Sequence, residues 1–168
     1  MTTACGLAYV DTGGPGPAVL FVHGVGAAGY AWRPQVDALS DRLRCLTFDN
    51  RGTGGSRPAA GRDTDPDALA AELAGVFGRD LADPPAVVSR QMKAMRAFNA
   101  TPYFGELAGR STLVVSADHD PIAPPSLGRA LSDGIPGSRF VELADASHGA
   151  TAYRPDAVNA LLVAHLTG

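Results

Sequence analysis

The sequence has few cysteines, no run of basic residues and no long apolar segment, and each absence argues against a class of protein. Two cysteines in 168 residues, Cys5 and Cys45, are too few for a disulfide scaffold and lack metal-ligand spacing. We expect both thiols to be buried or nearly so. A net charge of −3 without a basic run argues against nucleic-acid binding. No apolar run approaches the ~18 residues of a membrane span, and no secretory signal is visible, which favours a cytoplasmic location.

The remaining composition is typical of a soluble globular protein, with 45% hydrophobic and 18% charged residues. The length suits one domain with a modest core, so we expect a single minimal domain over residues 1–168.

Short apolar segments bounded by turn residues predict strands, and helical spacing predicts helices between them. The predicted strands are 6–10, 18–22, 44–48, 112–116 and 139–143, with 18–22 buried on both faces. The predicted helices are 31–43, one beginning near Asp65, 90–98, 126–132 and 155–166. This alternation predicts an α/β protein with a mostly parallel sheet flanked by helices. Ligands of such sheets bind beyond the carboxyl ends of the strands.

Residues suited to chemistry follow four of these strands. The segments are FVHGVG, FDNRGTGGS, VVSADHDP and DASHG, in that order. Together they resemble the α/β-hydrolase superfamily over nearly the whole chain, except from about residue 57 to 85. The resemblance implies a truncated α/β-hydrolase-like domain in which residues 57–85 replace the nucleophile elbow and the cap.

An acid and a base of a catalytic triad are implied by the last two segments. Asp120, before a proline, is similar to the family's acid, with Asp118 as the alternative, and His148 is similar to its general base. Such an acid holds the histidine in one tautomer and stabilises its cationic form. His119 and His165 fit no motif, and we expect them to be solvated.

The first two segments are expected to support the site with backbone groups and loop structure. By resemblance, the backbone N–H of Val25 would belong to an oxyanion hole. The alternative is a glycine-rich turn in which His23 is a structural hydrogen-bond partner. Asp49 and Arg51 are expected to form a buried network that holds their loop, with Ser56 as a loop hydroxyl.

The serine that should complete the triad is missing, because no G-x-S-x-G pentapeptide occurs in the chain. The segment between Ser56 and the strand at 112–116 is too short for two βα units and a cap. Ser147 adjoins the base and should point elsewhere. Four alternatives remain beside no chemistry at all: Ser56, Ser89, Ser116, or water activated by His148.

Loss of the centre has consequences for the sheet and for the site. The strands at 18–22 and 112–116 must either pair directly or leave exposed edges, which favour a homo-oligomer. Without a cap, the site would be open to bulky or polymeric esters. No metal, cofactor, membrane or nucleic-acid partner is expected.

Three functions are compatible with these residues. A carboxylic ester hydrolase is favoured by the acid–base pair, the oxyanion-type loop and the chemistry that the resemblance implies. The alternative is a catalytically impaired remnant that binds a ligand or a partner protein. A cofactor-free lyase or cyclase that uses the pair as a base is the third. The family's dehalogenases and epoxide hydrolases need an aspartate at the absent elbow, which argues against them.

Overall fold

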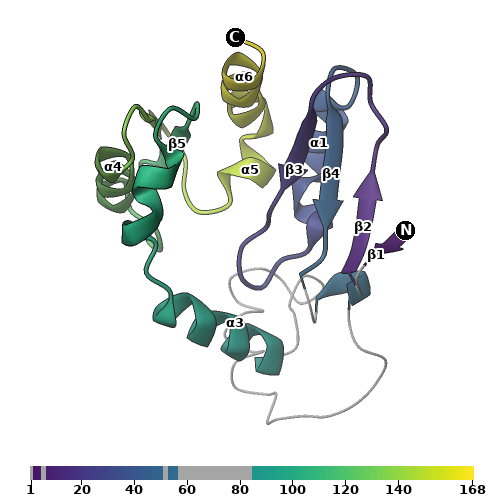
Figure 1. Cartoon of the computed structure of the whole chain (residues 1–168), viewed down its shortest axis with the longest axis horizontal. Helices are drawn as coiled ribbons and strands as arrows, with labels where there is room; N and C mark the ends of the chain where they lie inside the picture. The colour runs from purple at the N-terminus through teal and green to yellow at the C-terminus, as the bar shows by residue number, and fades with distance from the viewer. Residues whose placement is uncertain (1, 5–6, 51–52, 57–84) are drawn as a thin grey trace. The chain divides into compact units, whose positions relative to one another are not determined.

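The computed structural model describes residues 2–4, 7–50, 53–56 and 85–168, and the chain separates into two compact units (Figure 1). The first unit is Met1–Phe98 and the second is Asn99–Gly168. The helix expected near Asp65 lies outside the described residues.

The first unit is built on a four-stranded sheet in the order β1-β2-β4-β3. Its strands are β1 (Thr2–Ala4), β2 (Leu7–Asp11), β3 (Ala18–Phe21) and β4 (Arg44–Phe48). The β1–β2 and β2–β4 pairs are antiparallel, whereas β3 and β4 are parallel. The antiparallel strands come from the N-terminal hairpin, so the sheet is mixed. The parallel β3–β4 pair brings the loops that follow these two strands to the same edge.

The helix predicted at 31–43 begins earlier and ends earlier than expected. It starts as a 3-10 turn, η1 (Gly29–Trp32), and continues as α1 (Arg33–Leu39). A proline in the first turn of α1 suits the change from 3-10 to α-helix. This segment packs on one face of the sheet, where the rings of Phe21 and Trp32 lie 5.4 Å apart and Leu39 is fully buried. The unit also contains η2 (Gly54–Ser56) and α3 (Pro85–Ala97).

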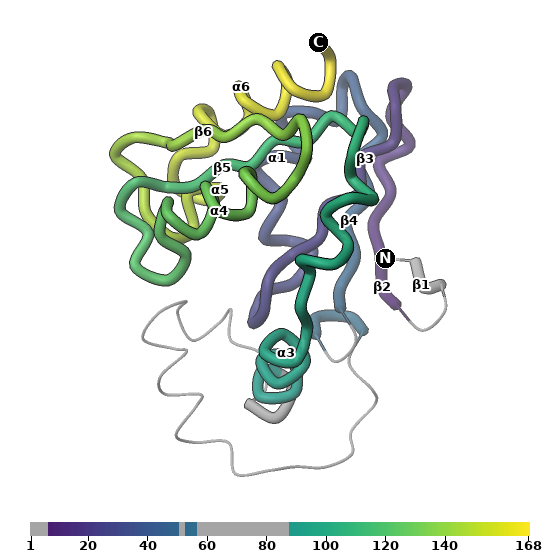
Figure 2. Tube along the Cα trace, turned by 60° about the vertical axis from the view of Figure 1, so that its left-hand side comes forward, coloured from purple at the N-terminus to yellow at the C-terminus, as the bar shows by residue number. Residues whose placement is uncertain are grey.

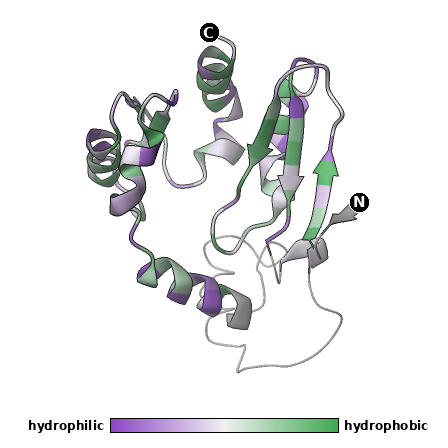
Figure 3. Ribbon diagram, viewed as in Figure 1, coloured by the Kyte–Doolittle hydropathy of each residue, from purple (hydrophilic) through white to green (hydrophobic). Residues whose placement is uncertain are grey.

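The prediction that β3 is buried on both faces is wrong. Figure 3 shows β3 as mainly hydrophobic, yet Leu20 is 60% exposed. The reason is that β3 is an edge strand within the described sheet, and only its Phe21 side is covered by the η1–α1 segment. An apolar run therefore indicates a strand but does not reveal how many layers cover it.

The second unit has a parallel pair of strands joined by a helix (Figure 2). Its elements are η4 (Thr101–Leu107), β5 (Leu113–Ala117), α4 (Pro125–Gly134), β6 (Arg139–Leu143), α5 (Ala150–Tyr153) and α6 (Pro155–Leu166). The register runs from Leu113 opposite Arg139 to Ala117 opposite Leu143. Both strands therefore end at the same edge, and the loops that follow them lie together.

The α/β class predicted from the sequence is confirmed, and each unit is built on its own sheet. β3 lies in the sheet of the first unit and β5 in that of the second. The two alternatives for these strands, direct pairing or exposed edges, stay predictions. None of the helices in the described part of the chain is long and apolar enough to cross a membrane.

Candidate active site

Asp120 and His148 lie beside each other in the loops that follow β5 and β6. The His148 Nδ1 atom is 3.0 Å from Asp120 Oδ2 and 3.2 Å from Oδ1. The Asp120 side chain is only 10% exposed, whereas that of His148 is 40% exposed. A nearly buried carboxylate thus contacts one nitrogen of a histidine ring that remains accessible.

The loop around Asp120 holds its carboxylate in place. Oδ1 accepts the backbone N–H of Ile122 at 2.8 Å and that of Ala123 at 2.9 Å, a local turn that aspartate side chains favour. Burial raises the pKa of Asp120, but the hydrogen bonds from Ala123, His148 and Ile122 outweigh it and leave this pKa below its ordinary value. The carboxylate is therefore ionised at neutral pH.

The contact with Asp120 determines which nitrogen of His148 can act as a base. An ionised carboxylate only accepts hydrogen bonds, so Nδ1 carries the proton in the neutral ring. Nε2 is then left with its lone pair. This arrangement has the geometry of an acid–base pair, and it selects Asp120 over Asp118 as the partner of His148.

Val25 lies in a turn of the first unit, between β3 and η1. The next residue, Gly26, has a φ of 77°, and its N–H donates to the Gln91 side chain at 3.3 Å. His23 is 6% exposed. Its Nε2 accepts the Asn50 N–H at 3.1 Å, and its Nδ1 donates to the Gly24 carbonyl. His23 is therefore a structural hydrogen-bond partner. The Gln91 contact was not foreseen, since a helical glutamine carries no signal in the sequence.

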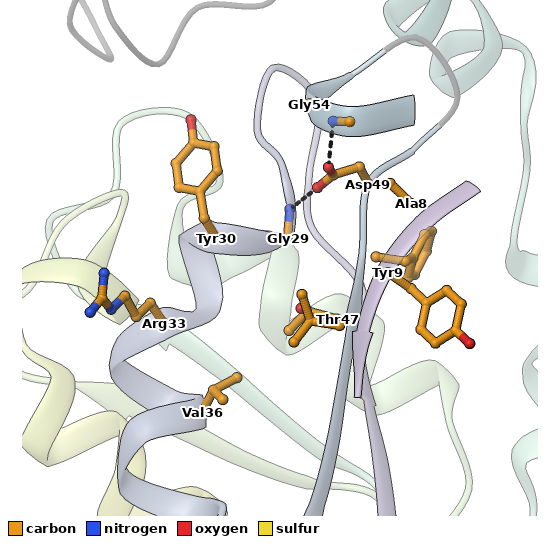
Figure 4. Close-up of a pocket in the computed structure, with 12 residues that line it drawn as sticks. Ala8, Tyr9, Gly29, Tyr30, Arg33, Val36, Thr47, Asp49 and Gly54 are labelled. Atoms are coloured by element: carbon orange, nitrogen blue, oxygen red, sulfur yellow. Dashed lines mark hydrogen bonds between the residues drawn. The ribbon is translucent and has the colours of Figure 1, made fainter. Parts of the chain in front are cut away.

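Asp49 holds the loop after β4, as expected, but through backbone groups. Its carboxylate accepts the N–H of Gly29 at 2.7 Å (Figure 4). It also accepts the N–H of Gly55 at 2.7 Å. A Cβ atom at Gly54 would lie 2.2 Å from Asp49 Oδ2, so this position requires glycine. Arg51, the expected partner of Asp49, lies outside the described residues.

Ser56 is a structural hydroxyl. It is 7% exposed, donates to the Asp49 carbonyl at 2.8 Å and accepts the Ala8 N–H at 2.7 Å. Both of these bonds link backbone segments of the first sheet. This geometry supports the interpretation of Ser56 as a loop hydroxyl and argues against a nucleophile.

The other serines are also placed unlike an elbow serine. Ser89 lies inside α3, which begins four residues earlier at Pro85, and not at the strand-to-helix turn that an elbow serine occupies. Ser116 is 9% exposed, and a Cβ atom at Gly128 of α4 would lie 2.0 Å from its hydroxyl, which shows that it faces the helix. The Ser147 N–H donates to the Tyr153 hydroxyl.

A cavity of about 430 Å³ lies within the first unit, between α1 and the strands β2 and β4 (Figure 4). Its lining includes Val36, Thr47 and Phe48 and is mainly apolar. It contains no residue of the acid–base pair, which lies in the second unit.

The remaining candidates for chemistry are accounted for by burial or exposure. Cys45 is buried at 1% exposure, and this burial raises the pKa of its thiol, whereas Cys5 lies outside the described residues. The His119 side chain is 74% exposed, as expected, and His165 is half-buried. Within the residues that the structure describes, no group of three or more potential ligands could hold a metal ion.

Two protein-family models match consecutive parts of the chain. The model described as alpha/beta hydrolase fold matches residues 17–88, and the model described as TAP-like protein, of the alpha/beta-hydrolase type, matches residues 87–168. The two matches meet at residues 87–88 and together span nearly the whole chain. The chain belongs to the α/β-hydrolase superfamily.

Individual relatives match shorter segments. The non-heme bromoperoxidase BpoC of Mycobacterium tuberculosis is 50% identical over 60 residues, which are 34% of this chain and 22% of that protein. The carbamate hydrolase RutD of Agrobacterium fabrum is 47% identical over 38 residues, 23% of this chain and 15% of the relative. The matched segments thus span about a fifth of the curated relatives.

A solved structure shares the fold across the chain. The enol-lactonase from Burkholderia xenovorans LB400 has a TM-score of 0.74 and 24% identity, with 96% of each chain covered.

Proposed function

We propose that the chain hydrolyses carboxylic esters, with His148 as general base and Asp120 as the acid that orients it. The observation that carries the proposal is the hydrogen bond of 3.0 Å between His148 Nδ1 and Asp120 Oδ2, which leaves Nε2 free on an accessible ring. A base positioned in this way accelerates proton transfer by about 10²–10⁴-fold.

Water is the proposed nucleophile. Ser56 and Ser116 have buried hydroxyls with structural surroundings, and Ser89 lies within a helix. Nε2 would take a proton from water as its oxygen attacks the ester carbonyl. The proton then passes to the departing alcohol, leaving a carboxylic acid. Val25, the oxyanion donor expected by resemblance, lies in the first unit, and its role stays a prediction.

The class of substrate is proposed from chemistry that the relatives share. A lactone is a cyclic ester, and both a lactone and a carbamate are cleaved at a carbonyl bonded to a heteroatom. The 40% exposure of His148 favours an open site that accepts bulky or polymeric esters. A hydrolase of this type needs no metal or cofactor for the steps proposed.

Turnover and labelling test the proposal together. We expect wild type to hydrolyse p-nitrophenyl butyrate without an initial burst, and a fluorophosphonate probe to leave every serine unlabelled. A burst with one labelled serine would replace water by a covalent route through that serine. No turnover by folded protein on short, long or polymeric esters would reject the enzymatic proposal.

The second candidate is a remnant that binds a ligand or a partner protein. It is favoured by one observation: in the described part of the chain, no serine hydroxyl is hydrogen-bonded to His148. Absence of turnover together with saturable binding of an ester, measured by calorimetry, would support this candidate.

We also propose that the chain self-associates. Leu20 of the edge strand β3 is 60% exposed, and Val22 just beyond it is 57% exposed. Exposed apolar strand edges favour pairing with another chain. Analytical ultracentrifugation should give a homo-oligomer that Leu20→Glu dissociates, and a wild-type monomer at all concentrations would reject the proposal.

A further inference from the structure

Asp118 lies two residues before Asp120 on the same loop, and it contacts the segment that carries His148. Its Oδ1 accepts the N–H of Ala146 at 2.9 Å, and its Oδ2 accepts the N–H of Asp145 at 3.0 Å. One carboxylate thus binds two successive amides of the loop after β6. These bonds lower the pKa of Asp118, that from Ala146 most strongly, so the carboxylate is ionised at neutral pH.

Arg154 contacts the same loop at the carbonyl side of Asp145. Its Nη1 donates to the Asp145 carbonyl at 2.7 Å. Asp145 has a φ of 51°, an unusual left-handed conformation for a residue other than glycine. Such a conformation persists where the surroundings hold it in place. Here both the N–H and the carbonyl of this residue are bound by charged side chains.

Hydrogen bonds hold each successive backbone residue from 145 to 147. The His119 N–H donates to the Ala146 carbonyl at 2.8 Å, and the Ser147 N–H donates to the Tyr153 hydroxyl. Every N–H from 145 to 147 is therefore bound by a side chain. The next residue is His148, whose side chain is 40% exposed.

We propose that Asp118 and Arg154 are positioning residues that clamp the backbone before His148 and thereby keep its Nδ1 in contact with Asp120. Asp118 and Asp120 thus have different roles in holding His148. Asp120 contacts the ring, whereas Asp118 fixes the backbone from which the ring projects. The inference rests on the proposed function only for its kinetic consequence, because the clamp itself can be measured without substrate.

Asp118→Asn tests the clamp with little change of shape. Asparagine keeps one carbonyl oxygen but turns an NH₂ group toward one of the two loop amides, so one hydrogen bond is lost. Misplacement of a catalytic group by about 1 Å costs up to about 10²-fold in rate. We expect kcat on p-nitrophenyl butyrate to fall about 10- to 100-fold with KM changed less than about twofold. Asp133→Asn, an exposed carboxylate of α4, is the matched control and should leave both constants unchanged.

Two measurements without substrate separate this inference from the proposed function. In wild type we expect a downfield NMR signal from the hydrogen-bonded His148 Nδ1–H, and slow amide exchange at Asp145 and Ala146. Asp118→Asn should remove the signal and speed exchange, and Asp133→Asn should not. One outcome is that wild type lacks esterase activity while Asp118→Asn still removes the His148 signal and speeds amide exchange. In that case the proposed function fails and the clamp stands.

The clamp is overturned if folded Asp118→Asn keeps wild-type kcat in an active enzyme. It is also overturned if the His148 signal and both protected amides persist in this variant. Should Asp118→Asn fail to fold, Arg154→Gln removes the bond to the Asp145 carbonyl from the other side. This second variant must then show the same loss of the His148 signal, or the inference is wrong.

Discussion

Replacement of Ser56 by alanine separates the structural role of this serine from a catalytic one. Its hydroxyl joins two buried backbone groups, the Ala8 N–H at 2.7 Å and the Asp49 carbonyl at 2.8 Å. Ala8 and Asp49 are only 2% and 6% exposed, so water does not readily replace the lost hydroxyl. Each buried polar group left unpaired costs about 1–3 kcal/mol. With two such groups, we expect Ser56→Ala to lower the free energy of unfolding by about 2–6 kcal/mol.

Urea unfolding followed by circular dichroism measures this effect. With a slope of about 2 kcal/mol/M, the expected loss lowers the urea midpoint by about 1–3 M. Ser89→Ala is the matched control, because Ser89 is exposed within α3 and alanine is the best helix former. Its free energy of unfolding should change by less than about 0.5 kcal/mol.

Ester hydrolysis by the same two variants completes the test. Measured per folded molecule, turnover should equal that of wild type in both, because neither hydroxyl is the proposed nucleophile. The reasoning is refuted if Ser56→Ala unfolds at the wild-type midpoint while it loses hydrolysis by about 100-fold or more. That outcome would make Ser56 the nucleophile.

Two further predictions concern the first unit. Gly54→Ala places a Cβ atom 2.2 Å from Asp49 Oδ2 on a backbone with a φ of 45°. We therefore expect the free energy of unfolding, measured with urea, to fall by at least about 1–2 kcal/mol. An unchanged urea midpoint would contradict this close approach. Hydrogen bonds from the Arg44 guanidinium, whose Nε lies 3.0 Å from Oδ1, and from the Gly13 N–H lower the pKa of Asp11 from 3.8 to about 2. A depressed folded pKa stabilises the fold above the unfolded value and loses this effect as pH falls through about 2. Asp11→Asn should thus lower the thermal midpoint at pH 7 and flatten its fall between pH 4 and 2, and parallel curves for variant and wild type would contradict this.

The sequence predicted most regular elements because their apolar patterns are local. The bounds of β4, β6 and α6 agree with the predicted segments 44–48, 139–143 and 155–166. The short elements β1, η4 and α5 were not predicted, since three to seven residues carry too little periodicity. The exposure of β3 was missed because a strand's own residues do not report whether its neighbour is present.

The candidate site could be predicted in part. The motif order brought Asp120 and His148 into one hypothesis, and both lie together at the end of β5 and β6. Asp118 was considered only as an alternative acid. Its contact with two loop amides depends on the left-handed turn at Asp145, and no residue pattern indicates such a turn. Arg154 was missed for the same reason.

A double-mutant cycle on ester hydrolysis tests the central claim most directly. The variants are His148→Ala, Asp120→Asn and the double variant, with His165→Ala as the control histidine. We expect His148→Ala to lower kcat by at least about 100-fold, and the double variant to be no slower, because residues that act as one unit lose their effect together. Wild-type kcat in folded His148→Ala, or losses that multiply in the double variant, would contradict the claim that Asp120 acts through His148.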